Sequence, residues 1–130
     1  MDPAQRDAPA DTVTISARQV GKRFDEFAAL VGLDLEVRRG ECVGLLGPNG
    51  AGKSTFIGCL YGAVGRTGGE LSVFGMDPIH DARRIKERLG VVPQENALDE
   101  GLTVLENMQL YARFEGLGGR DALPRIHELL

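Results

Sequence analysis

The residues best suited to chemistry lie in one short run, Gly47 to Ser54, which reads GPNGAGKS. The run fits the pattern G-x-x-x-x-G-K-[ST] at every fixed position. Glycines allow a backbone to curl so that successive N–H groups point at one anion, and a helix that starts directly after the loop adds the positive end of its dipole. The pattern therefore predicts a cradle for the phosphates of a nucleotide.

Each part of this loop has its own expected task. The Lys53 ammonium can reach β- and γ-phosphate oxygens, and the Ser54 hydroxyl can ligate the Mg²⁺ that accompanies a nucleotide. Thr55 can hydrogen-bond the α-phosphate. The backbone expected to surround the phosphates is that of Gly47, Pro48, Asn49, Gly50, Ala51 and Gly52.

The flanking elements fit such a loop. The nearly continuous apolar run ECVGLLG, residues 41–47, predicts a strand buried on both faces of a parallel sheet. Phe56, Ile57, Leu60 and Tyr61 follow at helical spacing, and Gly62 or Gly65 can end that helix. Upstream, alternation over residues 12–20 and 33–37 predicts two half-buried strands.

The remainder is more varied. We predict a short strand at residues 70–75, a helix over 77–90 with Asp77 as N-cap and Pro78 at its first position, and a short strand at 91–93. Thr103 and Glu106 form a predicted capping box for the next helix, and a last helical pattern follows residue 120. The fold class expected is α/β, with antiparallel strands ahead of a P-loop NTPase core.

Length, charge and cysteine content limit the number of domains and the classes of partner that the chain can have. The 130 residues suit one domain or part of one, and we expect a disordered tail at 1–11 followed by a single domain over 12–130. Fifteen basic against nineteen acidic residues give a net charge of -4, which argues against a nucleic-acid partner. Cys42 and Cys59 lie in apolar runs and are expected to be buried, and no Cys/His cluster predicts a metal site at either.

The particular filling of the loop, GPNGAGKST, resembles that of the ABC transporter ATPase family. Two other stretches agree with this resemblance, which covers about Val13 to Leu130. In KRFDEFAAL, it implies that Phe24, in the turn after the first strand, stacks on adenine, with Phe27 as the lesser candidate. In RLGVVPQENALDEG, it implies that Gln94 contacts Mg²⁺, the attacking water and a membrane partner.

The resemblance implies an ATPase that binds ATP and Mg²⁺, pairs with a second ATP-binding subunit and drives transmembrane permease subunits. Such a protein is cytoplasmic and lies on the inner face of the cell membrane. The wording around Gln94 further resembles the ATPases of ABC-2 type exporters, which include nodulation-factor and daunorubicin exporters.

Several family motifs do not occur in the sequence: the signature L-S-G-G-Q, an apolar strand ending in Asp-Glu, and a switch histidine, whose position neither His80 nor His127 matches. The chain thus resembles the first part of such a domain. We expect the chain by itself to be marginally stable, to bind Mg-ATP weakly and not to hydrolyse it.

Three other functions stay open. A GTPase would carry an N-K-x-D motif, which the sequence lacks. A nucleotide-binding protein without catalysis and an ABC-type ATPase without a membrane partner are both compatible with these residues.

Overall fold

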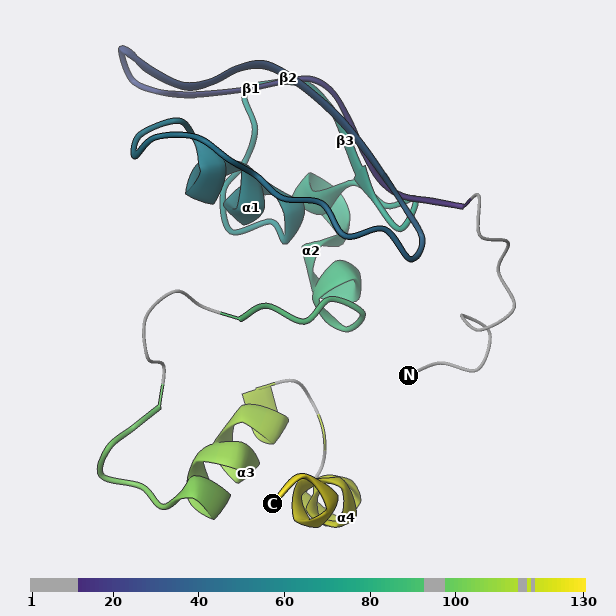
Figure 1. The fold of residues 1–130 in the computed structure, drawn as a ribbon, viewed down its shortest axis with the longest axis vertical. Helices are drawn as coiled ribbons and strands as arrows, with labels where there is room; N and C mark the ends of the chain where they lie inside the picture. The colour runs from purple at the N-terminus through teal and green to yellow at the C-terminus, as the bar shows by residue number, and fades with distance from the viewer. Residues whose placement is uncertain (1–11, 93–97, 115–116, 118) are drawn as a thin grey trace. The chain divides into compact units, whose positions relative to one another are not determined.

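The structure, a computed structural model, describes residues 12–92, 98–114, 117 and 119–130. The chain forms two compact units, Met1–Ile85 and Lys86–Leu130, which are described separately (Figure 1). The predicted tail at 1–11 lies outside the described residues.

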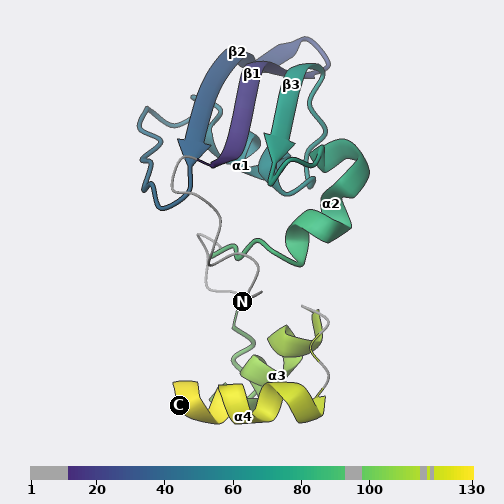
Figure 2. The same cartoon turned by 90° about the vertical axis from the view of Figure 1, so that its right-hand side faces the viewer.

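The first unit is built on a three-stranded antiparallel sheet. Its strands are β1 (Val13–Phe24), β2 (Phe27–Arg38) and β3 (Gly68–Val73), in the order β2-β1-β3 (Figure 2). Pairing of β1 with β2 runs from Val13 opposite Arg38 to Phe24 opposite Phe27. The predicted strands at residues 12–20, 33–37 and 70–75 are therefore confirmed, and the first two are longer than the alternation indicated.

Helix α1 (Lys53–Leu60) packs on one face of this sheet, as Figures 1 and 2 both show. Apolar side chains from all three strands meet the helix there because alternate residues of a strand face the same side. Tyr61 caps the helix, and Gly62 follows in a left-handed conformation, so the predicted end of the helix is confirmed. The buried core consists of Ala17, Val20, Leu30, Phe56, Cys59 and Leu71.

Helix α2 (Pro78–Lys86) begins as predicted. The Asp77 carboxylate accepts a hydrogen bond from the Ile79 N–H at 2.9 Å, which satisfies one of the free N–H groups of the first turn. The helix has non-helical dihedral angles at Asp81 and ends before the predicted stop at Gly90. Ile85 of this helix is fully buried.

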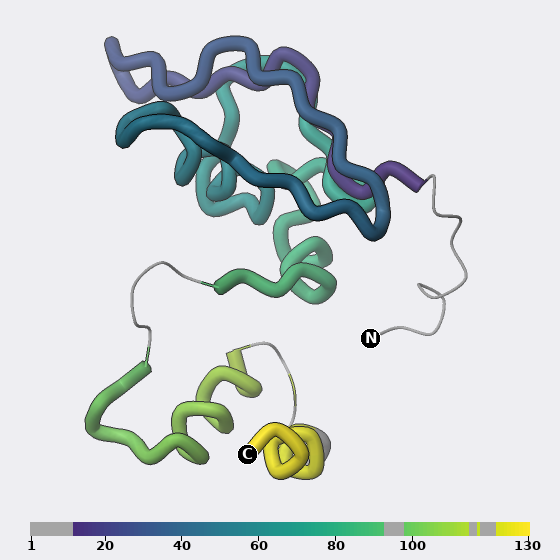
Figure 3. Tube along the Cα trace, viewed as in Figure 1, coloured from purple at the N-terminus to yellow at the C-terminus, as the bar shows by residue number. Residues whose placement is uncertain are grey.

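The predicted strand at residues 41–47 is wrong for this structure. The segment runs as an open chain between β2 and α1 (Figure 3), and Leu46 is 96% exposed. A strand is held by hydrogen bonds to a neighbour, and no described strand pairs with this segment. Cys42, in this segment, is exposed, so its expected burial is wrong. Of the strand predicted at residues 91–93, Val91 and Val92 likewise form no strand, and residue 93 lies outside the described residues.

The second unit contains α3 (Val104–Phe114) and α4 (Gly119–Leu129), which contact each other. The capping box before α3 is confirmed: the Thr103 N–H donates to Glu106 Oε2 at 2.8 Å, and the Glu106 N–H donates to Thr103 Oγ1 at 3.3 Å. The last helical pattern is confirmed by α4. In the part of the chain that is described, no helix has the length and apolar character that crossing a bilayer requires.

Candidate functional site

Two glycines of the loop have the left-handed backbone conformation that a tight glycine-rich turn requires. Gly50 and Gly52 have φ angles of +85° and +83°, in the left-handed region where a side chain is strained. The two residues bend the chain from the open segment 41–48 into the start of α1. The sharp turn exposes backbone N–H groups at the helix N-terminus, where an anion is favoured.

Gly52 also lies against the sheet. A Cβ atom at this position would come within 2.3 Å of the Ala29 carbonyl oxygen and 2.7 Å of Leu30 Cδ2. The close approach places the end of the loop directly on β2. It therefore ties the position of the loop to the hairpin formed by β1 and β2.

The start of α1 carries no competing acceptor. Gly52 is the N-cap and supplies no side-chain hydrogen bond, and the first turn holds no acidic residue. The Gly52 carbonyl accepts from the Phe56 N–H at 2.8 Å, which opens the helical ladder. The Ala51 N–H donates to the Pro48 carbonyl at 3.2 Å within the loop, while no side-chain acceptor caps the start of the helix. The positive end of the helix dipole there favours an anion.

Lys53 folds back over this loop. Its ammonium donates hydrogen bonds to the carbonyl oxygens of Gly47 and Pro48, both at 2.7 Å. These bonds hold the charge at the loop and neutralise two carbonyl dipoles that would otherwise repel an anion there. Ser54 is exposed and Thr55 is half-buried. No group of three or more metal-ligating side chains occurs among the residues described, so a Mg²⁺ ion here would rely on phosphate oxygens and the Ser54 hydroxyl.

Phe24 and Phe27 flank the two-residue turn between β1 and β2. They are 47% and 62% exposed, so neither is a core residue. The expected place of Phe24 in the turn is wrong, because Phe24 is the last residue of β1. The Lys22 ammonium lies 4.6 Å from the centre of the Phe24 ring. Phe27 is three residues from Leu30, or roughly 10 Å along the strand, so the aromatic pair lies within a nucleotide's reach of the loop.

Gln94, the other expected ligand of Mg²⁺, lies outside the described residues.

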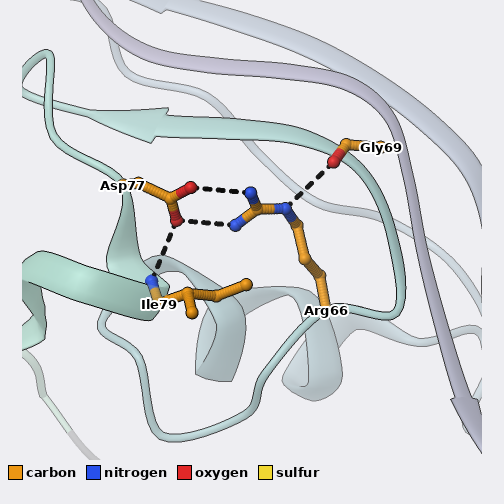
Figure 4. Close-up of polar contacts among 4 residues, drawn as sticks. All are labelled: Arg66, Gly69, Asp77 and Ile79. Carbon is orange, nitrogen blue, oxygen red and sulfur yellow. Dashed lines mark hydrogen bonds and ion pairs between the residues drawn. The ribbon is translucent and has the colours of Figure 1, made fainter.

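Sequence reasoning missed an ion pair beside α1. Arg66 donates two hydrogen bonds of 2.7 Å to the Asp77 carboxylate and one of 3.0 Å to the Gly69 carbonyl (Figure 4). The hydrogen bonds from Arg66 lower the pKa of Asp77 to about 2. This pair ties the chain after α1 to the start of α2. Only the N-cap signal of Asp77 was visible in the sequence, because the arginine lies 11 residues away.

A second missed residue organises the start of the helical unit. Asn107 is 4% exposed, and its Nδ2 donates to the carbonyls of Asp99, Leu102 and Thr103 at 2.9 to 3.2 Å. Its Oδ1 accepts from the Asp99 N–H at 2.9 Å. An amide side chain thus satisfies a whole turn of backbone ahead of α3. An asparagine four residues after a capping threonine was the available signal.

With this geometry in view, comparison with known proteins gives consistent results. The family model described as ABC transporter matches residues 30–129. Nod factor export ATP-binding protein I of Cupriavidus pinatubonensis is 40% identical over 129 residues, which is 98% of this chain and 39% of that protein. Daunorubicin resistance ATP-binding protein DrrA2 of Streptomyces coeruleorubidus is 42% identical, over 92% of this chain and 37% of that protein.

A solved structure extends the likeness to the fold. CbiO1 of Clostridium perfringens, described as part of the ABC transporter complex cbiONQ, superposes with a TM-score of 0.75 at 21% identity. The match covers 91% of this chain and 49% of that one. The expected α/β fold class with an N-terminal antiparallel sheet is therefore confirmed. The chain spans well under half the length of the two relatives that it matches.

Proposed function

Because the chain belongs to the ABC transporter ATP-binding family, we propose that it binds Mg-ATP at the loop of residues 47–55 and acts in an export ATPase. The observation that carries the proposal is the start of α1. There a left-handed glycine packed on β2, a helix N-terminus without an acidic residue and a lysine ammonium converge on one loop.

Each side chain has a defined part in holding the nucleotide. The loop backbone from Gly47 to Gly52 surrounds the phosphates, and Lys53 exchanges its two carbonyl acceptors for β- and γ-phosphate oxygens. Ser54 ligates Mg²⁺, Thr55 binds the α-phosphate, and Phe24 stacks on adenine, which contributes roughly 1–3 kcal/mol. Bound Mg-ATP would supply the phosphoryl group whose transfer releases the energy for transport. Positive charge at Lys53 would stabilise the negative charge that develops on that group.

The partners proposed follow from the two relatives, whose names place them in nodulation-factor export and daunorubicin resistance. We propose a second ATP-binding subunit and transmembrane permease subunits, with the chain on the cytoplasmic face of the membrane. Gln94 would reach Mg²⁺ and the permease. No L-S-G-G-Q signature occurs in the sequence, so hydrolysis is proposed for the complete transporter and not for these 130 residues by themselves.

The test is Mg-ATP binding by the purified chain, measured by isothermal titration calorimetry. Lys53→Ala removes a charged hydrogen-bond donor worth about 1.5–3 kcal/mol, so the dissociation constant should rise roughly 10- to 150-fold. Lys86→Ala is the matched control, because it removes the same charge at an exposed position at the end of α2. Equal binding by the wild-type chain and Lys53→Ala would contradict the proposal, and tighter binding of GTP than of ATP would favour the GTPase alternative.

A further inference from the structure

Lys22 stands between the two parts of the proposed nucleotide site. On β1 it is the register partner of Leu30, the residue whose side chain lies against Gly52 of the phosphate loop. Two residues further along β1 is Phe24, over whose ring the Lys22 ammonium lies at 4.6 Å from the ring centre. Lys22 thus lies between the strand residue that contacts the phosphate loop and the aromatic residue next to the hairpin turn.

The side of the sheet on which Lys22 lies follows from its pairing with Leu30. Residues directly opposite each other in an antiparallel pair present their side chains to the same face, and Leu30 belongs to the core cluster that includes Phe56 and Cys59 of α1. Lys22 therefore lies on the face of the sheet that α1 covers. The same face receives Gly52 and the start of the helix.

A half-exposed phenylalanine at the end of a hairpin is not held by packing. Phe24 keeps 47% of its surface exposed, so its ring has few neighbours to fix its rotamer. An ammonium over the ring face attracts the ring electrostatically and restrains it in one orientation. The cation occupies one face and draws π-electron density toward itself, and the remaining exposed surface is left for a second planar group.

We propose that Lys22 is a positioning residue for base recognition: its ammonium holds the Phe24 ring so that its free surface stacks on the adenine of ATP. The inference rests on the proposed function, because it concerns the same nucleotide. Lys22 itself is assigned no contact with the phosphates. Its effect should therefore appear with ATP and be absent with a ligand that lacks a base.

The experiment measures, for the full 130-residue chain, the dissociation constants of Mg-ATP and of Mg-tripolyphosphate at one ionic strength. Their ratio isolates the contribution of the base and ribose. An exposed cation–π contact of the usual strength corresponds to a two- to fivefold effect, so Lys22→Met should reduce the preference for ATP by that factor. Lys22→Arg should retain the preference, and the matched control Lys86→Met should leave both constants unchanged.

A double variant separates positioning from any general structural effect. If Lys22 acts through the ring, Lys22→Met should change nothing further in a Phe24→Ala background. Equal weakening of ATP and tripolyphosphate by Lys22→Met would overturn the inference and assign Lys22 to the phosphates. An unchanged ratio, or a full effect of Lys22→Met without the ring, would also overturn it.

Binding by the wild-type chain distinguishes failure of the inference about Lys22 from failure of the proposed function. If it binds tripolyphosphate but shows no preference for ATP, the inference about Lys22 fails while the phosphate site stands. If it binds neither ligand, the proposed function fails, and the inference fails with it.

Discussion

The contact of Gly52 with β2 gives the sharpest test of the loop geometry, through the substitution Gly52→Ala. The new Cβ would meet the Ala29 carbonyl oxygen at 2.3 Å, whereas ordinary contact begins at 3.4 Å, so backbone atoms must separate by about 1 Å. Forcing a non-glycine residue into the left-handed region costs about 1–2 kcal/mol, and overpacking adds about 1–3 kcal/mol. After the smaller entropy gain of alanine in the unfolded chain, we expect a net loss of about 2–4 kcal/mol.

Substitutions at two other glycines separate the cost of left-handed backbone from the cost of the close contact with β2. Gly50 has a φ of +85° but open space around it, so Gly50→Ala should lose only about 1 kcal/mol. Gly65 has open space and a φ outside the left-handed region, so Gly65→Ala should be neutral or slightly stabilising, by about 0.4–1 kcal/mol. The expected order of stability is Gly65→Ala, then Gly50→Ala, then Gly52→Ala.

Urea unfolding followed by tyrosine fluorescence would measure the three values. The chain has two tyrosines and no tryptophan, and the two units hold one tyrosine each. In a Tyr111→Phe background, Tyr61 at the end of α1 reports on the first unit alone. If Gly52→Ala costs no more than Gly50→Ala, the close approach to β2 is refuted, and with it the argument that the sheet positions the loop.

Other predictions concern the ion pair and the buried amide. The Asp77 carboxylate, whose pKa is lowered to about 2 from 3.8, stabilises the fold fully above pH 3.8 and loses that contribution as the pH falls through 2. Asp77→Asn should therefore flatten the pH dependence of stability between about pH 4 and 2, by about 1 kcal/mol because the pair is partly solvated and screened; an unchanged profile would contradict this. Asn107→Ala removes a hydrogen-bond partner of the Asp99 N–H and of the Leu102 carbonyl, while the Asp99 and Thr103 carbonyls keep backbone donors, so it should cost the second unit about 0.5–1.5 kcal/mol. Faster amide exchange at Asp99 would report that loss, and wild-type protection there would argue against the role of Asn107.

Features set by near neighbours could be predicted from the sequence. The N-cap at Asp77 and the capping box of Thr103 and Glu106 join residues two or three positions apart, so their geometry is written in the spacing. The strands β1, β2 and β3 and the glycine loop could also be predicted, because hydrophobic alternation and a need for left-handed backbone are local properties of the sequence. Residue spacing by itself predicts a phosphate-binding loop but no particular family. The resemblance of GPNGAGKST indicated the ABC transporter family, and the match of that family model to residues 30–129 confirms it.

The tertiary structure alone decided which distant groups meet. Apolar content predicted burial for residues 41–47, yet burial of a strand needs a hydrogen-bonding neighbour, and none pairs with it in the described chain, so Cys42 is exposed. The contact of Gly52 with Ala29 joins residues more than twenty positions apart, and the bulges between β1 and β2 decide which residue is opposite Lys22. Such contacts depend on the register and packing of whole elements. That is why the sequence identifies a phosphate loop, while the surface on which the loop is held becomes visible only in the folded chain.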